Sequence, residues 1–224
     1  MSPAVRVSLL LLAAALLALP ACSGKVPPHT QLVEAAGKLD GLALSDALEA
    51  LIAAGQDTPA DRAYAYEQVK ASEQNTAAYA FARAAVTGRL VQQKGLLAAN
   101  LVGEVERFAR QSRDLDPNFR DGAATRMLGT LYVIAPASLL QHGDSERGLE
   151  LLEQQVKAHP NGLENHLRLA EAYVALGDTE PAKVHLCRCL AGKSALRRDD
   201  QKLLAQLMVD AGPMSCEPSP TPSP

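Results

Sequence analysis

Apolar residues recur at the three- and four-residue spacing of amphipathic helices along most of the chain. The first such stretch runs from Gln31 to Ala54, with Ser45 as a candidate N-cap and Gly55 as its end. A second helix begins at Pro59, because proline is favoured in the first turn of a helix. Further helices are expected from the Asn75-Thr76 break to Gln93, from Val102 to Leu115, and from Ser194 to Ala211.

The segment from Asp121 to Leu190 contains one pattern twice. A helix carries Leu128, Gly129 and Tyr132 in the first copy, and Leu169, Ala170 and Tyr173 at the same spacing in the second. A glycine or alanine lets two helices approach closely, while the large neighbours fill the groove beside the contact. This pattern is typical of the tetratricopeptide repeat (TPR). The other expected packing positions are Pro136, Gly143, Gly148, Leu152 and Pro160 in the first copy, and Gly177, Ala182, Leu186 and Cys189 in the second.

The turns between these helices complete the predicted architecture. The second copy has standard TPR spacing, whereas the first has an enlarged turn that starts at Ala135-Pro136. Two proline stops, Asp116-Pro117-Asn118 and His159-Pro160-Asn161, end helices at equivalent places. We therefore predict an all-α fold over residues 31–212, in which TPR-like helix hairpins stack as a superhelical domain with a C-terminal capping helix.

The N-terminal part has the pattern of a bacterial lipoprotein leader. Arg6 precedes an apolar run from Val7 to Leu19, which is too short for a comfortable membrane span. Leu19-Pro20-Ala21-Cys22 resembles a lipobox, so we expect residues 1–21 to be a signal peptide and Cys22 to be lipidated. The alternative is an ordinary secretory signal in which Cys22 is incidental. Ser23, in place of an aspartate, favours the outer membrane, with the domain facing the periplasm.

Two segments flank the predicted domain. Residues 22–30 contain Pro27-Pro28 and are expected to be a tether. Residues 213–224 are rich in proline, serine and threonine, and are expected to be disordered because they cannot bury a core.

The composition supports helices and excludes some classes of function. The chain is 47% hydrophobic but only 4% aromatic, and alanine and leucine dominate it, which favours helix over strand. The net charge of −3 comes from interspersed charges, unlike the basic surface of a nucleic-acid-binding protein. The sequence contains none of the common nucleophile, phosphate-binding, zinc-protease or dinucleotide motifs. We therefore expect a protein that is not an enzyme and that uses no cofactor.

The cysteine and histidine residues near the end of the second copy are the candidates for metal or redox chemistry. Cys187, Cys189, His185 and His166 have the right ligand atoms for zinc, but residues two apart point to different sides of a helix. Cys189 fits better as a small core residue. We expect no metal site. A disulfide between Cys187 and Cys216 is geometrically possible in an oxidising periplasm, and the sequence leaves this pairing open.

The charged and aromatic side chains of the repeats have two interpretations. Arg126 and Arg168 lie on the first helices of the repeats, where they would either contact a ligand or partner or remain exposed and solubilising. Tyr132 and Tyr173 are expected to be core residues. The carboxylates of Glu104, Glu106, Glu150 and Glu153 are spaced as solvated helix faces.

Several motifs together resemble one known family. They are Arg126-Met127-Leu128-Gly129-Thr130-Leu131-Tyr132, Ala135-Pro136, Gly143-Asp144, the leucines at 149, 151 and 152, and Asn165-His166-Leu167-Arg168-Leu169-Ala170-Glu171. This combination is similar to the TatT family, lipoproteins associated with tripartite ATP-independent periplasmic (TRAP) transporters. The resemblance covers most of the mature chain and is sharpest from about Asp114 to Leu190. Leu139 or a neighbour stands where the family often has a second proline.

The resemblance implies a function in binding. It implies a tethered helical-repeat domain that forms a trimer, pairs with the periplasmic solute-binding protein of a TRAP transporter, and presents a hydrophobic ligand cleft or pore. The alternative hypothesis is a TPR scaffold lipoprotein that assists assembly of outer-membrane or envelope complexes. A third hypothesis is a metal- or redox-active module built on the cysteine and histidine group.

Overall fold

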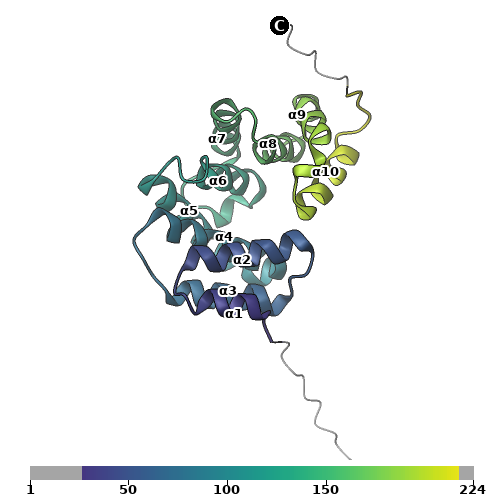
Figure 1. The fold of residues 1–224 in the computed structure, drawn as a ribbon. Coiled ribbons are helices and arrows are strands. Elements are labelled where there is room, and N and C mark those ends of the chain that lie inside the picture. Colours follow the sequence, from purple (N-terminus) through teal and green to yellow (C-terminus); the bar gives the residue numbers. More distant parts are fainter. Residues whose placement is uncertain (1–26, 217–224) are drawn as a thin grey trace, which may run out of the picture.

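The structure, a computed structural model, describes residues 27–216 and is all-α there, as the sequence predicts. The predicted leader, Cys22, most of the tether and most of the tail lie outside the described residues. Figure 1 shows the helices following one another in an arc, from α1–α3 through α4–α6 to α7–α9, with α10 returning toward the start.

The helices form an N-terminal layer, three hairpins and a last helix. The layer consists of α1 (Thr30–Ala36), α2 (Gly41–Ala54) and α3 (Pro59–Ala71). The hairpins are α4 (Ala77–Lys94) with α5 (Val102–Leu115), α6 (Ala123–Ile134) with α7 (Ser145–Ala158), and α8 (Leu163–Ala175) with α9 (Thr179–Ala191). The last helix is α10 (Arg198–Asp210). The 3-10 helices η1 (Gly95–Leu101), η2 (Ala137–Leu139) and η3 (Lys193–Ala195) lie in the connections.

Local chemistry sets several helix boundaries. Thr58 and Asp61 form a capping box at the start of α3, where Pro59 occupies the first turn. Gly55 ends α2 in the left-handed conformation, with φ of 67°. The side chain of Asp144 caps α7 by accepting a hydrogen bond from the backbone N–H of Arg147.

The structure corrects the predicted first helix. The stretch from Gln31 to Ala54 is broken after Ala36, and Leu39 in the break has a positive φ of 54°. Asp40, not Ser45, caps α2, because its side chain accepts hydrogen bonds from the backbone N–H groups of Leu42 and Ala43. Ser45 is buried inside α2 instead.

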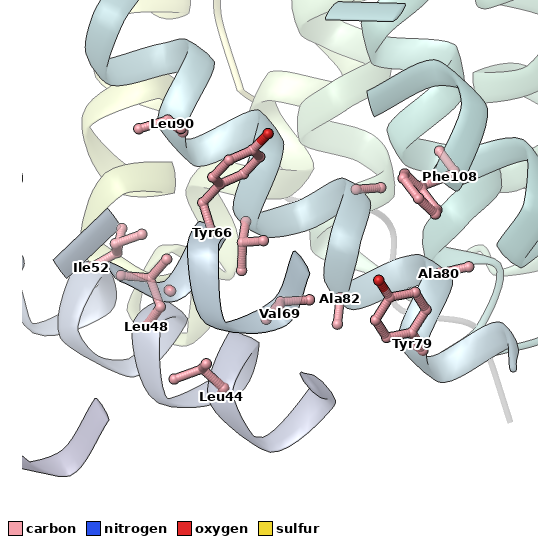
Figure 2. Close-up of a cluster of buried hydrophobic side chains, with 14 of the residues drawn as sticks. Leu44, Leu48, Ile52, Tyr66, Val69, Tyr79, Ala80, Ala82, Leu90 and Phe108 are labelled. Atoms are coloured by element: carbon pink, nitrogen blue, oxygen red, sulfur yellow. The ribbon is translucent and has the colours of Figure 1, made fainter. Parts of the chain in front are cut away.

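The largest core cluster joins the N-terminal layer to the first hairpins. Figure 2 shows Leu44, Leu48 and Ile52 of α2 facing Tyr66 and Val69 of α3, with Leu90 of α4 above them. Tyr79 and Phe108 pack edge to face, with ring centroids 6.2 Å apart. Buried alanines of α4 lie among these large side chains and allow the helices to approach closely. A second cluster holds α8, α9 and α10 together.

The last helix differs from the predicted open cap in two ways. It begins at Arg198 rather than Ser194, because Leu196 is buried in an extended conformation and Arg197 is the N-cap. Its start also contacts α2, and the guanidinium of Arg198 donates a hydrogen bond to the carbonyl oxygen of Ala54. The arc of helices is therefore closed by contact between its first and last parts.

Candidate binding surface

Small residues bring the helices of the first TPR-like pair into backbone contact. A Cβ atom on Gly129 would lie 2.7 Å from Cγ of Leu152 and 2.9 Å from the carbonyl oxygen of Gly148. A Cβ atom on Gly148 would lie 2.8 Å from the carbonyl oxygen of Gly129. Any side chain at either position would push α6 and α7 apart. In the second pair, Ala170 and Ala182 are fully buried in one cluster.

The other predicted packing residues lie in the core or in turns. Leu128, Tyr132, Leu152 and Leu169 are buried. Pro136 and Pro160 lie in the turns that follow α6 and α7. Tyr173 is half-buried, and its hydroxyl donates a hydrogen bond to the Glu153 carboxylate, at an oxygen–oxygen distance of 2.7 Å. Burial and the Glu153 carboxylate together raise the pKa of Tyr173 to about 12.

A buried carboxylate holds the enlarged turn between α6 and α7. Glu106 of α5 is only 1% exposed, and it accepts hydrogen bonds from the backbone N–H groups of Gln141 and His142, each at 2.8 Å. Gly143 lies against the ring of Tyr132, where a Cβ atom would overlap the ring. Burial and the Glu106 carboxylate raise the pKa of Tyr132. The turn is therefore fixed from α5 and from α6.

The prediction that the carboxylates lie on solvated helix faces is wrong for the two on α5. Besides Glu106, Glu104 forms an ion pair with the buried Arg83 at 2.7 Å and accepts a hydrogen bond from the hydroxyl of Thr87 at 2.9 Å. The physical reason is that α5 packs between α4 and α6, so its polar side is covered as well as its apolar side. Glu150 and Glu153, by contrast, are exposed.

A hollow of about 590 Å³ lies where the start of α6, the turn between α7 and α8, and the chain before α10 come together. Arg126, Glu164 and Leu196 are among the residues that line it. Its wall includes both charged and apolar side chains, which is the usual composition of a surface that binds a peptide or a protein. We treat this hollow as the candidate binding site.

Strained backbone borders the hollow. Arg120, Asp121 and Gly122 have consecutive positive φ values of 51°, 54° and 73°. The first two are unfavourable for residues with a side chain, at a cost of about 1–2 kcal/mol each. Arg120 is held by two hydrogen bonds to Asp46, at 2.7 and 2.6 Å, and the carbonyl oxygen of Asp121 accepts a hydrogen bond from Gln155. Strain of this kind is concentrated at functional sites in proteins.

Arg126 is held at the hollow by two polar partners. Its guanidinium donates to the Asn165 side chain at 2.8 Å and to the Glu164 carboxylate at 2.9 Å. The side chain is 19% exposed, so the solubilising role that was the alternative for Arg126 does not describe it. Burial lowers the pKa of Arg126, but arginine remains charged at every physiological pH.

Arg168 belongs to a continuous ion network that reaches from α8 to α2. It pairs with Glu171 at 2.9 Å and with the buried Asp200 at 2.6 Å. Arg197 pairs with Asp200 at 3.1 Å and with Glu49 of α2 at 2.5 Å. Arg126 thus lies at the hollow, and Arg168 belongs to the ion network that helps to close the arc.

The network is completed by Arg89 of α4, which makes two hydrogen bonds to Glu49 and pairs with Asp199 at 3.2 Å. Burial would lower the pKa of Arg197, but the carboxylates of Asp200 and Glu49 raise it above its usual range. Burial would raise the pKa of Asp199, but Arg197 and Arg89 hold it below its usual range. Both shifts favour the charged forms of Arg197 and Asp199.

The cysteine and histidine residues do not converge on one site. Cys187 is bonded to Cys216 in a disulfide, and Cys189 is buried and free, with its pKa raised by burial to about 12. His166 and His185 contact each other through their Nδ1 atoms at 2.8 Å. Within residues 27–216, no three His, Cys, Asp or Glu residues are placed to hold a metal ion.

The sequence named Arg126 and Arg168 as candidates for a partner surface but did not predict the side chains that they contact. Glu49 and Arg89 are separated from Arg197 by more than a hundred residues, and no local pattern links them. The positive φ values of Arg120 and Asp121 also gave no signal, because only a few per cent of residues other than glycine adopt positive φ, even though aspartate is enriched among them. The sequence did mark the Ala-Pro and Gly-Asp pairs of the enlarged turn, and the proline stop at His159-Pro160-Asn161, which lines the hollow.

None of the helices within residues 27–216 is long and apolar enough to cross a membrane.

Comparison with known proteins agrees with the fold. No curated protein matches the chain. The tetratricopeptide repeat family matches residues 139–188, which include α7, α8 and most of α9. The chain is therefore a TPR-like protein, and TPR domains serve as scaffolds for protein interaction.

Proposed function

We propose that the protein is a TatT-like lipoprotein that binds the periplasmic solute-binding protein of a TRAP transporter. In this proposal Cys22 is acylated and anchors the chain in the outer membrane, with the TPR-like domain in the periplasm. Assembly as a trimer and binding of a hydrophobic ligand are further parts of the same proposal, because both follow from the resemblance to that family.

The enlarged turn is the observation that carries the proposal. An ordinary TPR pair needs only a short turn, yet here residues 135–144 form a fixed excursion held by the buried Glu106 and packed against Tyr132. The Ala-Pro and Gly-Asp pairs that mark the resemblance lie in this turn. A buried carboxylate is costly unless it is fully hydrogen-bonded, so the turn is a specified feature rather than a loose insertion.

The hollow beside Arg126 supplies a surface for the partner. The strained segment 120–122, the ion-paired Arg126 and the apolar Leu196 lie together there. Because Arg126 is already held by Glu164 and Asn165, it would meet a partner without further ordering of its side chain.

Photo-crosslinking in native envelopes tests the partner. A benzophenone amino acid in place of Ala195, which is exposed at the hollow, should capture a solute-binding protein. The same substitution at Val184, 66% exposed on α9, is the matched control and should not. Capture of barrel-assembly or secretion proteins at Ala195, without a solute receptor, would overturn the proposal.

Arg126→Ala should weaken this capture about tenfold, as expected for loss of one charge-assisted contact of about 1.4 kcal/mol. Arg147→Ala is the control, because Arg147 only forms an exposed pair with Glu150. Equal capture by both variants would remove Arg126 from the partner surface.

Fractionation tests the anchor separately. Cys22→Ser should move the protein from the outer-membrane fraction to the soluble periplasm, because it removes the acylated thiol. If the variant stays with membranes, Cys22 is not the anchor.

The alternative function is a TPR scaffold for envelope assembly. The family match favours this alternative, because the matching family is the general tetratricopeptide repeat. The match begins at residue 139 and so includes only part of the enlarged turn. Crosslinking at Ala195 separates the two functions, since each names a different partner.

A further inference from the structure

The connection between α4 and α5 carries the most exposed large apolar side chains in the described chain. Leu96 and Leu97 are adjacent on η1, and each is 90% exposed. Gly95, with φ of 55°, ends α4 just before them. A single exposed leucine is ordinary, but two adjacent ones at a helix-hairpin tip form a small apolar prominence that no intramolecular packing accounts for.

This apolar tip lies at the end of the molecule where the tether joins the domain. The backbone N–H and the ring of His29 bond to Asp61 at the start of α3, at 2.8 and 2.9 Å. The next residue, Arg62, donates a hydrogen bond to the carbonyl oxygen of Arg89 near the end of α4, at 3.1 Å. α4 ends at Lys94, and the tip follows directly after Gly95.

The tether is short compared with the size of the domain. His29, where the chain is fixed to α3, comes seven positions after Cys22. Because an extended chain spans at most about 3.3–3.6 Å per residue, His29 cannot lie more than about 25 Å from an acylated Cys22. The end of the domain that carries Leu96 and Leu97 is therefore kept close to any bilayer that holds Cys22.

The charge around the tip suits a bilayer surface. Lys94, the last residue of α4, is separated from the tip only by Gly95 and is exposed. Arg198, exposed on α10, lies at the same end because it bonds to the carbonyl oxygen of Ala54 at the end of α2. An apolar prominence flanked by cations fits the interface of a bilayer that contains anionic lipid.

We propose that Leu96 and Leu97 insert into the lipid bilayer beside the acyl anchor, so that two points hold the domain at the membrane. The proposal rests on the acylation of Cys22 in the proposed function. A single anchor point would let the domain rotate, whereas two points fix which end faces the bilayer. The turn between α1 and α2, which lies at the opposite end, would then point away from the membrane.

An environment-sensitive fluorophore on one introduced thiol tests this orientation. Leu97→Cys places the probe at the tip, and Leu39→Cys places it on another leucine that is 74% exposed. Leu39 is at the opposite end of α3 and α4, since its carbonyl oxygen accepts a hydrogen bond from Gln74 in their turn. Cys187 and Cys216 are in a disulfide and Cys189 is buried, so the introduced thiol is the accessible one within residues 27–216.

The full acylated chain is placed in vesicles of phosphatidylethanolamine and phosphatidylglycerol and collected by flotation. We expect a blue shift of the emission and protection from aqueous iodide for the probe at residue 97, and neither effect at residue 39. Flotation without a blue shift at residue 97, or with equal shifts at both residues, overturns the insertion while leaving the anchor intact.

Two further outcomes also decide the matter. A chain that does not float contradicts the anchor, and the insertion with it. A blue shift at residue 97 in the detergent-free Cys22→Ser variant without vesicles would show that the tip is covered by a second protein copy, which also overturns the proposal. Leu96→Ser combined with Leu97→Ser should leave flotation unchanged but should abolish the protection from iodide of a probe placed at Asn100, which is exposed on the same 3-10 helix.

Discussion

Gly129 illustrates how single residues set the spacing of the helices. A methyl group there would meet Leu152 and the backbone of Gly148 at less than 3 Å, so Gly129→Ala should destabilise the protein by about 1–2 kcal/mol. Gly88, inside α4, has no atom within 4 Å of the place that a Cβ atom would take, so Gly88→Ala should stabilise by about 0.5–1 kcal/mol through helix propensity. Urea denaturation measures both. Shifts of the same sign would contradict the packing at Gly129.

The histidine pair is a second feature of residue scale. Nε2 of His166 lies 2.8 Å from the carbonyl oxygen of Pro160 and must donate to it. In the neutral pair, Nδ1 of His166 therefore accepts a hydrogen bond from the N–H at Nδ1 of His185. The ring of Tyr173 stacks on His185 with an interplanar angle of 14°. This packing leaves the pair best satisfied when both rings are neutral.

The pair should make stability depend on pH. Burial lowers the pKa of His185 to about 4, and the charges of His166 and Arg188 act in the same direction while Glu153 opposes them. Burial also lowers the pKa of His166. A lowered histidine pKa means that the unfolded chain binds more protons. The stabilisation is therefore complete above about pH 6.5 and is lost as the pH falls toward 4.

We expect a loss of about 1–2 kcal/mol between pH 7 and pH 4.5, after allowance for solvent screening of these partly exposed rings. His185→Gln should flatten this dependence, while His142→Gln, in the enlarged turn, should retain it. Urea denaturation at a series of pH values provides the measurement. An unchanged slope in His185→Gln would assign the pH dependence to other groups.

At the scale of elements, the disulfide joins α9 to the chain that follows α10. Cys187 and Cys216 are 29 residues apart and enclose η3 and α10. Closing a loop of that size stabilises the folded state by about 2–4 kcal/mol in the chain-entropy account. Reduction with dithiothreitol should therefore lower the free energy of unfolding by that amount.

Cys216→Ser is the matched control for the disulfide. It should have the stability of the reduced protein and should not respond to dithiothreitol. If reduction also destabilises Cys216→Ser, the reductant acts elsewhere, and if it leaves the native chain unchanged, the disulfide does not contribute to its stability.

At the scale of the whole molecule, Glu49 joins the first and last parts of the arc. It accepts hydrogen bonds from Arg89 and Arg197, which come from α4 and from the start of α10. Glu49→Gln removes the charge that both guanidinium groups share. We expect α10 to separate from α2, with a larger radius of gyration in X-ray scattering and a loss of about 1–3 kcal/mol, discounted for the partial exposure of these groups.

Glu150→Gln is the control for Glu49→Gln, because Glu150 forms only an exposed pair with Arg147 within one helix. It should change stability by less than about 0.5 kcal/mol and leave the radius of gyration unchanged. Equal radii for the two variants would mean that hydrophobic contacts of α10, and not the ion network, keep the arc closed.

The sequence by itself determined the local structure. Helix periodicity, Pro59, Gly55 and the proline stops act over a few residues, so they predicted the helices and most of the turns. The repeated small residues predicted the TPR-like hairpins for the same reason, since each hairpin is a contact between neighbouring helices. The break after Ala36 and the late start of α10 were missed because Leu39 and Leu196 continue the apolar pattern outside helices.

Only the tertiary structure decided which charged residues are buried and which distant elements meet. Glu106 looks like a solvated residue in sequence, and it is buried because α5 is covered on two sides. Glu49 meets Arg197 because small rotations between successive helix pairs add up along the arc until α10 reaches α2. Such an accumulated rotation depends on every packing contact between the pairs, and no local sequence pattern contains it.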